Sequence, residues 1–400
     1  MRIDLGPEVE KFRGEVRDWI KTNRFQELDQ IDEEEYNLFA SPSEAVQEWV
    51  SRLRKDRWLC VAWPEEYGGR GLGPLELSVV NQEFAAAKVP RITMGMGEWL
   101  VGPSIIAHAT EEQKAFFLPR IVSGEDRYCQ GFSEPDAGSD LAGLKTKGVV
   151  EGDEIIVTGQ KVWTSGASRC NMVFTLARTD PEAPKHNGIS YVLVPMDDNN
   201  VTYRPIKQIT GESHFFEVFY DGARAPMFNV IGGLNNGWKV AMTTLGNERG
   251  ATAATQHLRF EGELWDLVDL AKKLGKSEDP LVRQHLAWAY THVELMRMQG
   301  LRILAGIAAG KGLGPESSIN KLFWSEYHKR LGEVAMEILG PAGFATAGAN
   351  GVDAQRWWHT FLSARAETIY AGTSEIQRKI ISERVLGLPR ESQVKKAQSA

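Results

Sequence analysis

The sequence predicts a mainly helical α+β protein in which a β domain separates two helical domains. Apolar residues recur at helical spacing near both ends of the 400-residue chain. Its middle instead carries short runs of β-branched and aromatic residues, separated by clusters of Gly, Asp, Asn and Pro. A chain of this length exceeds one compact core. We therefore expect an N-terminal helical domain over residues 1–124, a central antiparallel β domain over 125–232 and a C-terminal helical bundle over 233–400.

The N-terminal block is predicted to be a set of helices. The first presents an apolar face, with charges between its members, formed by Val9, Phe12, Val16, Trp19 and Ile20. Further helices are expected over 43–55, 74–87 and 111–117, the last ended by Leu118-Pro119. The glycines at 68–73 follow a Pro-Glu-Glu-Tyr turn rather than a strand, which favours a tight interhelical loop over a dinucleotide-binding fingerprint.

The central block indicates strands at 154–158, 172–176, 190–194 and 216–220. No helix of the length that a parallel crossover needs lies between them, so an antiparallel barrel or sandwich is favoured over a doubly wound sheet.

Helical spacing returns from Gly237 onward. One face of a long buried helix is formed by Leu286, Ala289, Val293, Met296 and Ile303. Pro280, Pro315 and Pro341 are expected to separate the helices of this block.

Composition excludes several classes of protein. The 46 basic and 53 acidic side chains leave a net charge of −7 without a basic run, which argues against binding nucleic acid or an anionic membrane. No apolar stretch is long enough to cross a bilayer, and no signal or transit segment is recognisable. Three separated cysteines argue against a disulfide framework, and eight scattered histidines against a metal site. We expect a cytoplasmic protein without membrane insertion.

Two segments of the β block combine small hydroxyl residues, glycines and an aromatic ring, at 132–140 and 159–166. Each is compatible with a simple turn flanked by strands. The same residue types also suit the recognition of a planar, hydrogen-bonding ring system, with Trp163 stacking on the ring and Ser133 and Ser165 bonding its polar edge.

A third segment, at 369–378, has the pattern of a turn followed by a helix. Thr373 is the expected N-cap, and Gly372 relaxes the entry. Free amide groups at such a helix start favour phosphate binding.

These three segments, in this order, resemble the acyl-CoA dehydrogenase family. The resemblance covers nearly the whole chain, from Pro64-Glu65-Glu66-Tyr67-Gly68-Gly69, through Thr110-Glu111-Glu112-Gln113-Lys114 and the segment 118–125, to Gly372-Thr373-Ser374-Glu375-Ile376-Gln377. It implies a C-terminal four-helix bundle and a bound FAD between the β domain and this bundle.

The resemblance also assigns roles to individual residues. It places Phe132, Ser133, Trp163 and Ser165 beside the flavin ring, and Thr373 and Glu375 near the adenosine-pyrophosphate portion of FAD. The resemblance places Ser139 near the pantetheine arm of an acyl-CoA substrate. It also implies contacts between this substrate and four further residues, Arg249, Tyr370, Ala371 and Gly372.

The implied reaction is α,β-desaturation of an acyl thioester, with proton removal by a carboxylate and hydride transfer to flavin N5. Many members carry this carboxylate in a Tyr-Glu-Gly-Thr motif, but here Ala371 replaces the Glu. A minority, including isovaleryl-CoA dehydrogenase, carries it directly before an Arg in the C-terminal domain. Glu248-Arg249 matches that alternative, so Glu248 is the predicted catalytic base.

Two departures from the family pattern bear on the oligomeric state of the protein. The Arg-x-x-Phe-Gly stretch that reaches a neighbouring subunit's FAD is replaced by 276–280, and the usual Gln and paired glycines by 337–343. The resemblance implies a homodimer or homotetramer with electron-transfer flavoprotein as acceptor, and these departures also admit a hetero-oligomer with a related subunit. A flavin acyl-CoA oxidase, a non-catalytic subunit and a helical scaffold without cofactor are the alternatives.

Overall fold

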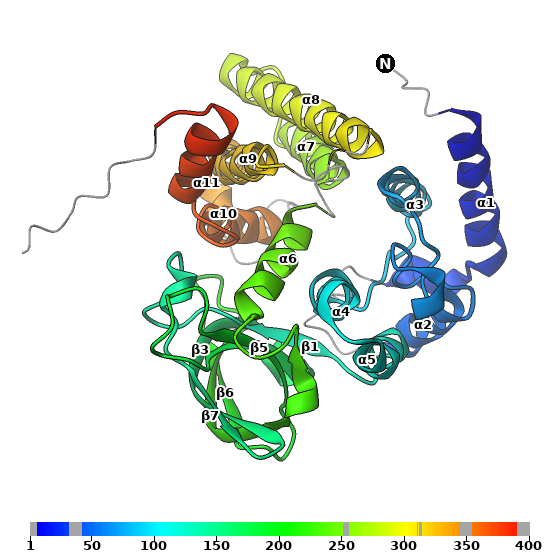
Figure 1. Cartoon of the computed structure of the whole chain (residues 1–400). Coiled ribbons are helices and arrows are strands. Elements are labelled where there is room, and N and C mark those ends of the chain that lie inside the picture. The colour runs from blue at the N-terminus through cyan, green and yellow to red at the C-terminus, as the bar shows by residue number, and fades with distance from the viewer. Residues whose placement is uncertain are drawn as a thin grey trace, which may run out of the picture. The chain divides into compact units, whose positions relative to one another are not determined.

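The computed structural model describes residues 6–31, 42–250, 256–309, 311, 314–344 and 354–389. The described residues up to 250 form one compact unit, and those from 256 onward form a second (Figure 1). Within the first, N-terminal helices pack on a β-sheet. Helices alone form the second, so the expected order of helical, β and helical blocks is confirmed.

Five α-helices make up the N-terminal part of the first unit: α1 (Pro7–Asn23), α2 (Glu44–Lys55), α3 (Pro74–Ala86), α4 (Gly102–His108) and α5 (Glu111–Ser123). Their starts follow the sequence: prolines open α1 and α3, Ser43 caps α2, and Thr110 with Gln113 forms a capping box on α5. Helix α5 continues past Pro119, where a stop was expected. Leu118 and Ile121 are fully buried, and their packing holds the last turn despite the missing N–H.

Aromatic side chains fill the centre of this helical layer. Trp49, Trp58 and Phe84 are almost fully buried and surround Trp19, whose ring centroid lies 5.3 Å from Trp58 and 5.4 Å from Trp49. Trp49 Nε1 donates to the carbonyl of Pro90 over 2.8 Å, so its one polar atom is satisfied in the core.

The β domain is an eight-stranded sheet that curls around its own apolar interior (Figure 1). Its strands are β1 (Tyr128–Gly131), β2 (Lys147–Glu151), β3 (Glu154–Ser165), β4 (Met172–Arg178), β5 (Ile189–Pro195), β6 (Val201–Ile206), β7 (Phe215–Pro226) and β8 (Val230–Ile231). The order is β6-β7-β3-β2-β4-β5-β8, and β1 pairs with β4. The pairing is antiparallel, as expected, except that β4 runs parallel to β1 and β2.

Helix α6 (Gly237–Gly250) lies in the first of the two compact units. It packs on β5 and α4. Its contacts are polar as well as apolar: Thr244 Oγ1 lies 2.7 Å from Ser104 Oγ, and Thr243 Oγ1 lies 2.7 Å from His108 Nε2. Helix α6 is therefore held by α4 as well as by β5.

The second unit contains α7 (Gln256–Lys273), α8 (Pro280–Ala308), α9 (Ser317–Leu339), α10 (Gln355–Glu367) and α11 (Ser374–Ile380). Pro280 opens α8, Pro315 precedes α9 and Pro341 follows it, as the sequence predicts. Buried Leu267, Val293 and Leu331 belong to one apolar core shared by α7, α8 and α9. Among the described residues, no helix is both long and apolar enough to span a membrane.

Candidate functional site

An irregularity in β3 shapes the first candidate surface. The pairing of β3 with β7 slips between Lys161 and Thr164, so Val162 and Trp163 form a bulge. Trp163 adopts a φ of 61°, a left-handed conformation that is costly for a bulky residue. Its side chain is 59% exposed. The bulge thus turns a large aromatic plate outward at the cost of backbone strain, a combination that is common at functional sites.

The bulge also carries a neighbouring segment. The N–H of Val162 donates to the carbonyl of Ser133 over 2.9 Å, which joins the chain after β1 to the bulge of β3. Phe132 is buried, with its ring edge-on to Phe174 and Tyr191. Ser133 stays half-buried. The structure therefore brings Phe132 and Ser133 next to the strand that presents Trp163.

Two further predicted residues, Ser165 and Ser139, lie on the β domain. Ser165 ends β3, two residues beyond Trp163, and is half-buried. The segment 159–165 is a strand with a bulge, not the turn that its glycine and hydroxyl residues also allowed. Ser139 lies exposed in the loop that follows Ser133, and no described contact ties it to the bulge.

Sequence reasoning missed a buried ion pair beneath this surface. Lys161 is fully buried, and its Nζ lies 2.8 Å from Glu134 Oε1 and 3.1 Å from the carbonyl of Phe132. The strand period gives a clue in retrospect, because Ile155, Val157 and Lys161 share one face of β3 and the first two are plainly apolar.

Glu248 and Arg249 lie in the last turn of α6. Their side chains are outside the part of the chain that the structure describes, so the predicted base is located by its backbone alone. That backbone continues a helix fixed on β5 and α4.

The second candidate surface is the turn between α10 and α11. Ala371 has a φ of 51° and Gly372 a φ of 88°, and the carbonyls of both accept hydrogen bonds from Gln377 Nε2 at 3.0 and 3.2 Å. Thr373 caps α11 by accepting from the N–H of Ile376 over 3.2 Å, as predicted. Among the described residues, none accepts a hydrogen bond from the N–H groups of Ala371, Gly372 or Thr373. The turn therefore presents three consecutive donors to a ligand.

The flanking residues differ in exposure. Tyr370 is 47% exposed, and the Glu375 side chain is 81% exposed. A hydrogen bond from its own backbone N–H, together with Thr373, lowers the pKa of Glu375 below its usual value. This carboxylate is thus ionised at neutral pH.

Helix α9 holds both ends of the turn. Lys321 Nζ donates to the carbonyl of Glu367 over 2.8 Å, and His328 Nδ1 lies 2.6 Å from the Glu367 carboxylate. At the other end, Ser374 Oγ donates to Glu326 over 2.6 Å. Sequence reasoning missed these anchors, which come from residues far apart in the chain.

The residues that depart from the family's cofactor motifs have local partners. Glu337 pairs with Arg330 at 2.9 Å and with His285 at 3.1 Å. Asp279 accepts the N–H groups of Leu281 and Val282 at the start of α8. In the described part of the chain, no three His, Cys, Asp or Glu side chains gather as metal ligands would.

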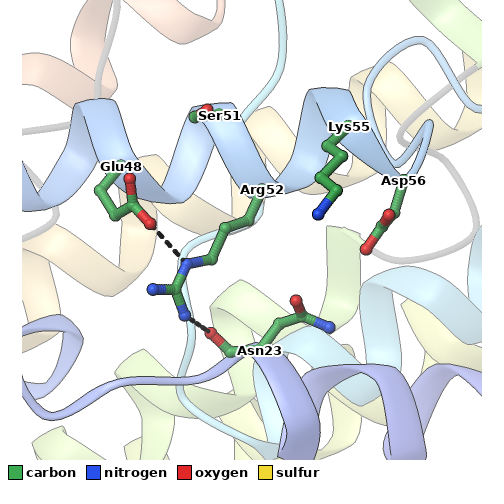
Figure 2. Close-up of a pocket in the computed structure, with 6 residues that line it drawn as sticks. All are labelled: Asn23, Glu48, Ser51, Arg52, Lys55 and Asp56. Carbon is green, nitrogen blue, oxygen red and sulfur yellow. Dashed lines mark hydrogen bonds and ion pairs between the residues drawn. The ribbon is translucent and has the colours of Figure 1, made fainter.

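A surface pocket of about 310 Å³ lies elsewhere, between the end of α1 and α2 (Figure 2). It is lined by Asn23, Glu48, Ser51, Arg52, Lys55 and Asp56. Arg52 spans it, donating to Glu48 at 2.8 Å and to the Asn23 carbonyl at 2.7 Å. None of the predicted site residues lines this pocket, so it is not a candidate active site.

Known proteins match the chain over nearly its whole length. Models of the N-terminal, middle and C-terminal domains of acyl-CoA dehydrogenase match residues 6–125, 129–220 and 235–386. Acyl-CoA dehydrogenase IpdE1 of Mycobacterium tuberculosis is 41% identical over 390 residues, which cover 96% of this chain and 99% of that protein.

Solved structures give the same result. The structure named Tcur3481-Tcur3483 steroid ACAD superposes with a TM-score of 0.83 at 32% identity, over 98% of this chain and 100% of the other. The ChsE4-ChsE5 complex from Mycobacterium tuberculosis gives 0.80 at 30% identity, over 98% and 100%. This chain therefore belongs to the acyl-CoA dehydrogenases, oxidoreductases whose cofactor is FAD.

Proposed function

We propose that this chain is a catalytic acyl-CoA dehydrogenase in which Glu248 removes the α-proton of an acyl thioester. The observation that carries the proposal is the exchange between two positions: alanine stands at 371, where many members have the base, and a carboxylate followed by arginine stands at 248. An alanine side chain cannot accept a proton, so the base must come from another element. Helix α6, which packs on β5 and α4, carries this carboxylate in its last turn.

The residues on the β domain fit a flavin. A ring system needs an apolar plate and polar groups at its edge. Trp163 is exposed on its bulge, and Ser133 and Ser165 are accessible beside it. When bound, FAD supplies a two-electron acceptor that takes a hydride from Cβ of the substrate.

The chain's own residues handle the proton and the developing negative charge. The Cα–H bond breaks as its proton passes to the Glu248 carboxylate, and the electron pair of that bond forms the Cα=Cβ double bond as hydride leaves Cβ. The thioester oxygen gains negative charge during this step. The N–H of Ala371, which has no acceptor among the described residues, is the donor that we assign to this oxygen.

For the substrate, the relatives suggest where to begin. One structural relative is named a steroid ACAD, and alanine at 371 leaves more room beside the thioester than glutamate would. We propose a bulky, steroid-type acyl thioester, with branched short acyl groups as the second choice.

For partners, we propose electron-transfer flavoprotein as the electron acceptor and an oligomer as the working enzyme. Structural relatives include a complex of two chains, ChsE4 and ChsE5, which supports assembly with a related subunit alongside the homodimer or homotetramer. The three free cysteines suit a reducing compartment, and we propose the cytoplasm.

The test is an anaerobic absorption titration of the purified, FAD-loaded protein with a panel of steroid-type, branched and straight-chain acyl-CoA thioesters. The expected result is bleaching of the flavin band by one class at stoichiometric concentration. Reoxidation in air then separates an oxidase from a dehydrogenase, which reacts slowly with oxygen. If no acyl-CoA bleaches the flavin, alone or in a co-expressed complex with a related subunit, the catalytic assignment is wrong and a non-catalytic subunit is favoured.

A further inference from the structure

The buried lysine beneath the bulge of β3 has no role in the mechanism above. Lys161 is fully buried, and its ammonium touches the two residues that flank Ser133: the carbonyl of Phe132 at 3.1 Å and the carboxylate of Glu134 at 2.8 Å. Burying an ammonium is costly, and an apolar side chain of similar size often fills such a place at no loss of stability. Stability alone therefore does not explain why a charged side chain is buried at position 161.

The carboxylate partner is fully engaged. Besides Lys161, Glu134 accepts the N–H of Lys145 at 2.7 Å and that of Thr146 at 2.9 Å. Its own backbone exchanges two hydrogen bonds with Ala137, both of 3.1 Å. Glu134 is thus held in one place, and Lys161 is held to it.

Both partners are ionised at neutral pH. Burial lowers the pKa of Lys161 to about 8, against the opposing effect of Glu134. Burial favours the neutral form of Glu134, but Lys161 and the two N–H donors outweigh it and bring the pKa of this carboxyl below its usual value.

The pair joins the two halves of the predicted ring-binding surface. Lys161 is the last residue before the bulge, and the next residue, Val162, donates to the carbonyl of Ser133. Two consecutive residues of β3 thus bond the carbonyls of two consecutive residues, Phe132 and Ser133. This double attachment fixes the 132–134 segment relative to the strand that presents Trp163.

We propose that Lys161 is a positioning residue of the flavin site, whose ammonium holds Phe132 and Glu134 so that Ser133 and Trp163 keep the separation that the ring requires. The proposal rests on the assignment of these residues to FAD above. It concerns cofactor binding and not proton transfer.

A matched set of variants separates positioning from stability. Lys161→Met removes the ammonium and keeps the length of the side chain. The double variant Lys161→Met with Glu134→Gln also removes the carboxylate that would be left buried without its cation, so it is expected to fold. Lys145→Met is the control, because the Lys145 side chain is 76% exposed and its contact with Glu134 is through the backbone.

For each variant, the unfolding of the apoprotein, the dissociation constant of FAD and the visible absorption of bound FAD are measured. We expect the double variant to unfold in a single transition but to bind FAD at least about 10-fold more weakly, with a shifted flavin band. Lys145→Met should match the wild type. Glu134→Gln alone should weaken FAD binding less than Lys161→Met does, because the hydrogen bond from Lys161 to the carbonyl of Phe132 remains.

A cooperatively folded double variant with wild-type FAD affinity and spectrum would overturn the proposal, as would a loss in Lys145→Met equal to that in Lys161→Met. If the double variant does not fold, the FAD affinities of the two single variants decide. FAD binding that is weakened as much in Glu134→Gln as in Lys161→Met would then overturn the proposal. Failure of the proposed reaction looks different: the wild type would then bind FAD without being reduced by any acyl-CoA, and the comparison of FAD affinities would stand.

Discussion

His328 Nδ1 lies 2.6 Å from the carboxylate of Glu367, in the interior of the second unit. Its other nitrogen, Nε2, lies 3.0 Å from Glu263, whose carboxylate also binds Arg259 at 3.0 Å. Two positive and two negative groups thus balance in one cluster. Because Glu367 is the last residue of α10, this cluster fixes the entry to the turn that carries Ala371.

The cluster makes stability depend on pH. Burial favours neutral His328, but hydrogen bonds and charges from Glu263 and Glu367 outweigh it and raise the pKa to about 9 from 6.5. Between these values the folded state binds more protons than the unfolded state, so stability is complete below pH 6.5 and falls as pH rises through 9. The whole contribution is about 3 kcal/mol, of which about half is lost between pH 6.5 and pH 8. Urea unfolding at these two pH values measures it.

His328→Gln is the comparison, because it removes the titrating group and keeps a donor toward Glu367. Its stability should change by less than half as much over the same interval. Arg259, Lys321 and Tyr327 also face this cluster. The pKa values of Arg259 and Tyr327 are raised above their usual values, so these two groups do not titrate between pH 6.5 and pH 8. Burial lowers the pKa of Lys161 to about 8, so this residue makes stability rise as pH increases through that value, which opposes the effect of His328 near pH 8. An equal slope in wild type and variant would assign the dependence to other groups.

Trp163 offers a test of strain against ligand binding. Trp163→Ala and Trp163→Gly both remove the ring. Each should weaken the binding of FAD by about 10-fold, because a stacking contact of about 1 kcal/mol or more is lost. They differ in the backbone, because at a φ of 61° glycine is relaxed and alanine is not. The apoprotein of the Gly variant should therefore be more stable than that of the Ala variant by about 1 kcal/mol. FAD titration of both variants measures the affinity, and thermal unfolding of both apoproteins measures the difference in stability. Unchanged FAD affinity would show that Trp163 is not part of the flavin site.

The features that could be predicted from the sequence are those that depend on residues close together in the chain. Strands β4 and β5 could be predicted because continuous apolar runs such as 191–194 are buried on both faces. The N-cap at Thr373 could be predicted because the interaction spans three residues. The bulge at Trp163 could not, since it depends on the pairing of β3 with β7, some fifty residues away.

The same holds for the buried charges. His328, Glu263 and Glu367 come from three helices, and in the sequence each looks like a solvated helix residue. Only the packing of α7, α9 and α10 brings them together. The role of Glu248 remains a prediction from motif position.

Packing at Gly102 gives a further prediction. A Cβ built there would lie 2.0 Å from Trp63 Cζ2 and 2.7 Å from the carbonyl of Gly97. Trp63 is buried, and its Nε1 donates to the carbonyl of Glu98 over 3.1 Å. Gly102→Ala should therefore destabilise the first unit by about 1–3 kcal/mol. Gly14→Ala is the control, because Gly14 lies within α1 and a Cβ there meets nothing within 4 Å. It should stabilise by about 0.5–1 kcal/mol. Chemical unfolding distinguishes the two, and a neutral Gly102→Ala would show that Trp63 has another rotamer available.

The space left by Ala371 is tested by Ala371→Glu. The added side chain would occupy room that we assign to a bulky acyl group, so the variant should keep FAD while its reduction by steroid-type thioesters slows by about 10-fold or more. Short straight-chain thioesters should be affected much less. Stopped-flow reduction with both classes measures the difference. Equal effects on the two classes would mean that acyl size does not explain the alanine.

Glu248→Gln tests the central chemical assignment. Glutamine keeps the size and hydrogen bonding of the side chain but cannot take a proton, so FAD should remain bound while its reduction by substrate slows by at least about 100-fold. Chemistry narrows the choice of base, because the group must face the α-carbon in a dry pocket, where desolvation raises a carboxyl pKa toward the working pH. Glu375 does not meet this requirement, since its side chain is 81% exposed and its pKa lies below the usual value.

Glu375→Gln is therefore the matched control: it removes a carboxylate from the turn beside Ala371 and should leave the rate of reduction within about threefold of the wild type. The two variants are compared in anaerobic single-turnover reduction with the best thioester of the panel, after FAD content and unfolding confirm that each is intact. Near-normal reduction in FAD-loaded Glu248→Gln would remove Glu248 from the mechanism. A large loss in Glu375→Gln as well would point instead to disturbance of the turn between α10 and α11. The N-cap at Thr373 and the N–H of Ala371, which has no acceptor in the described part of the chain, lie within four residues of that side chain.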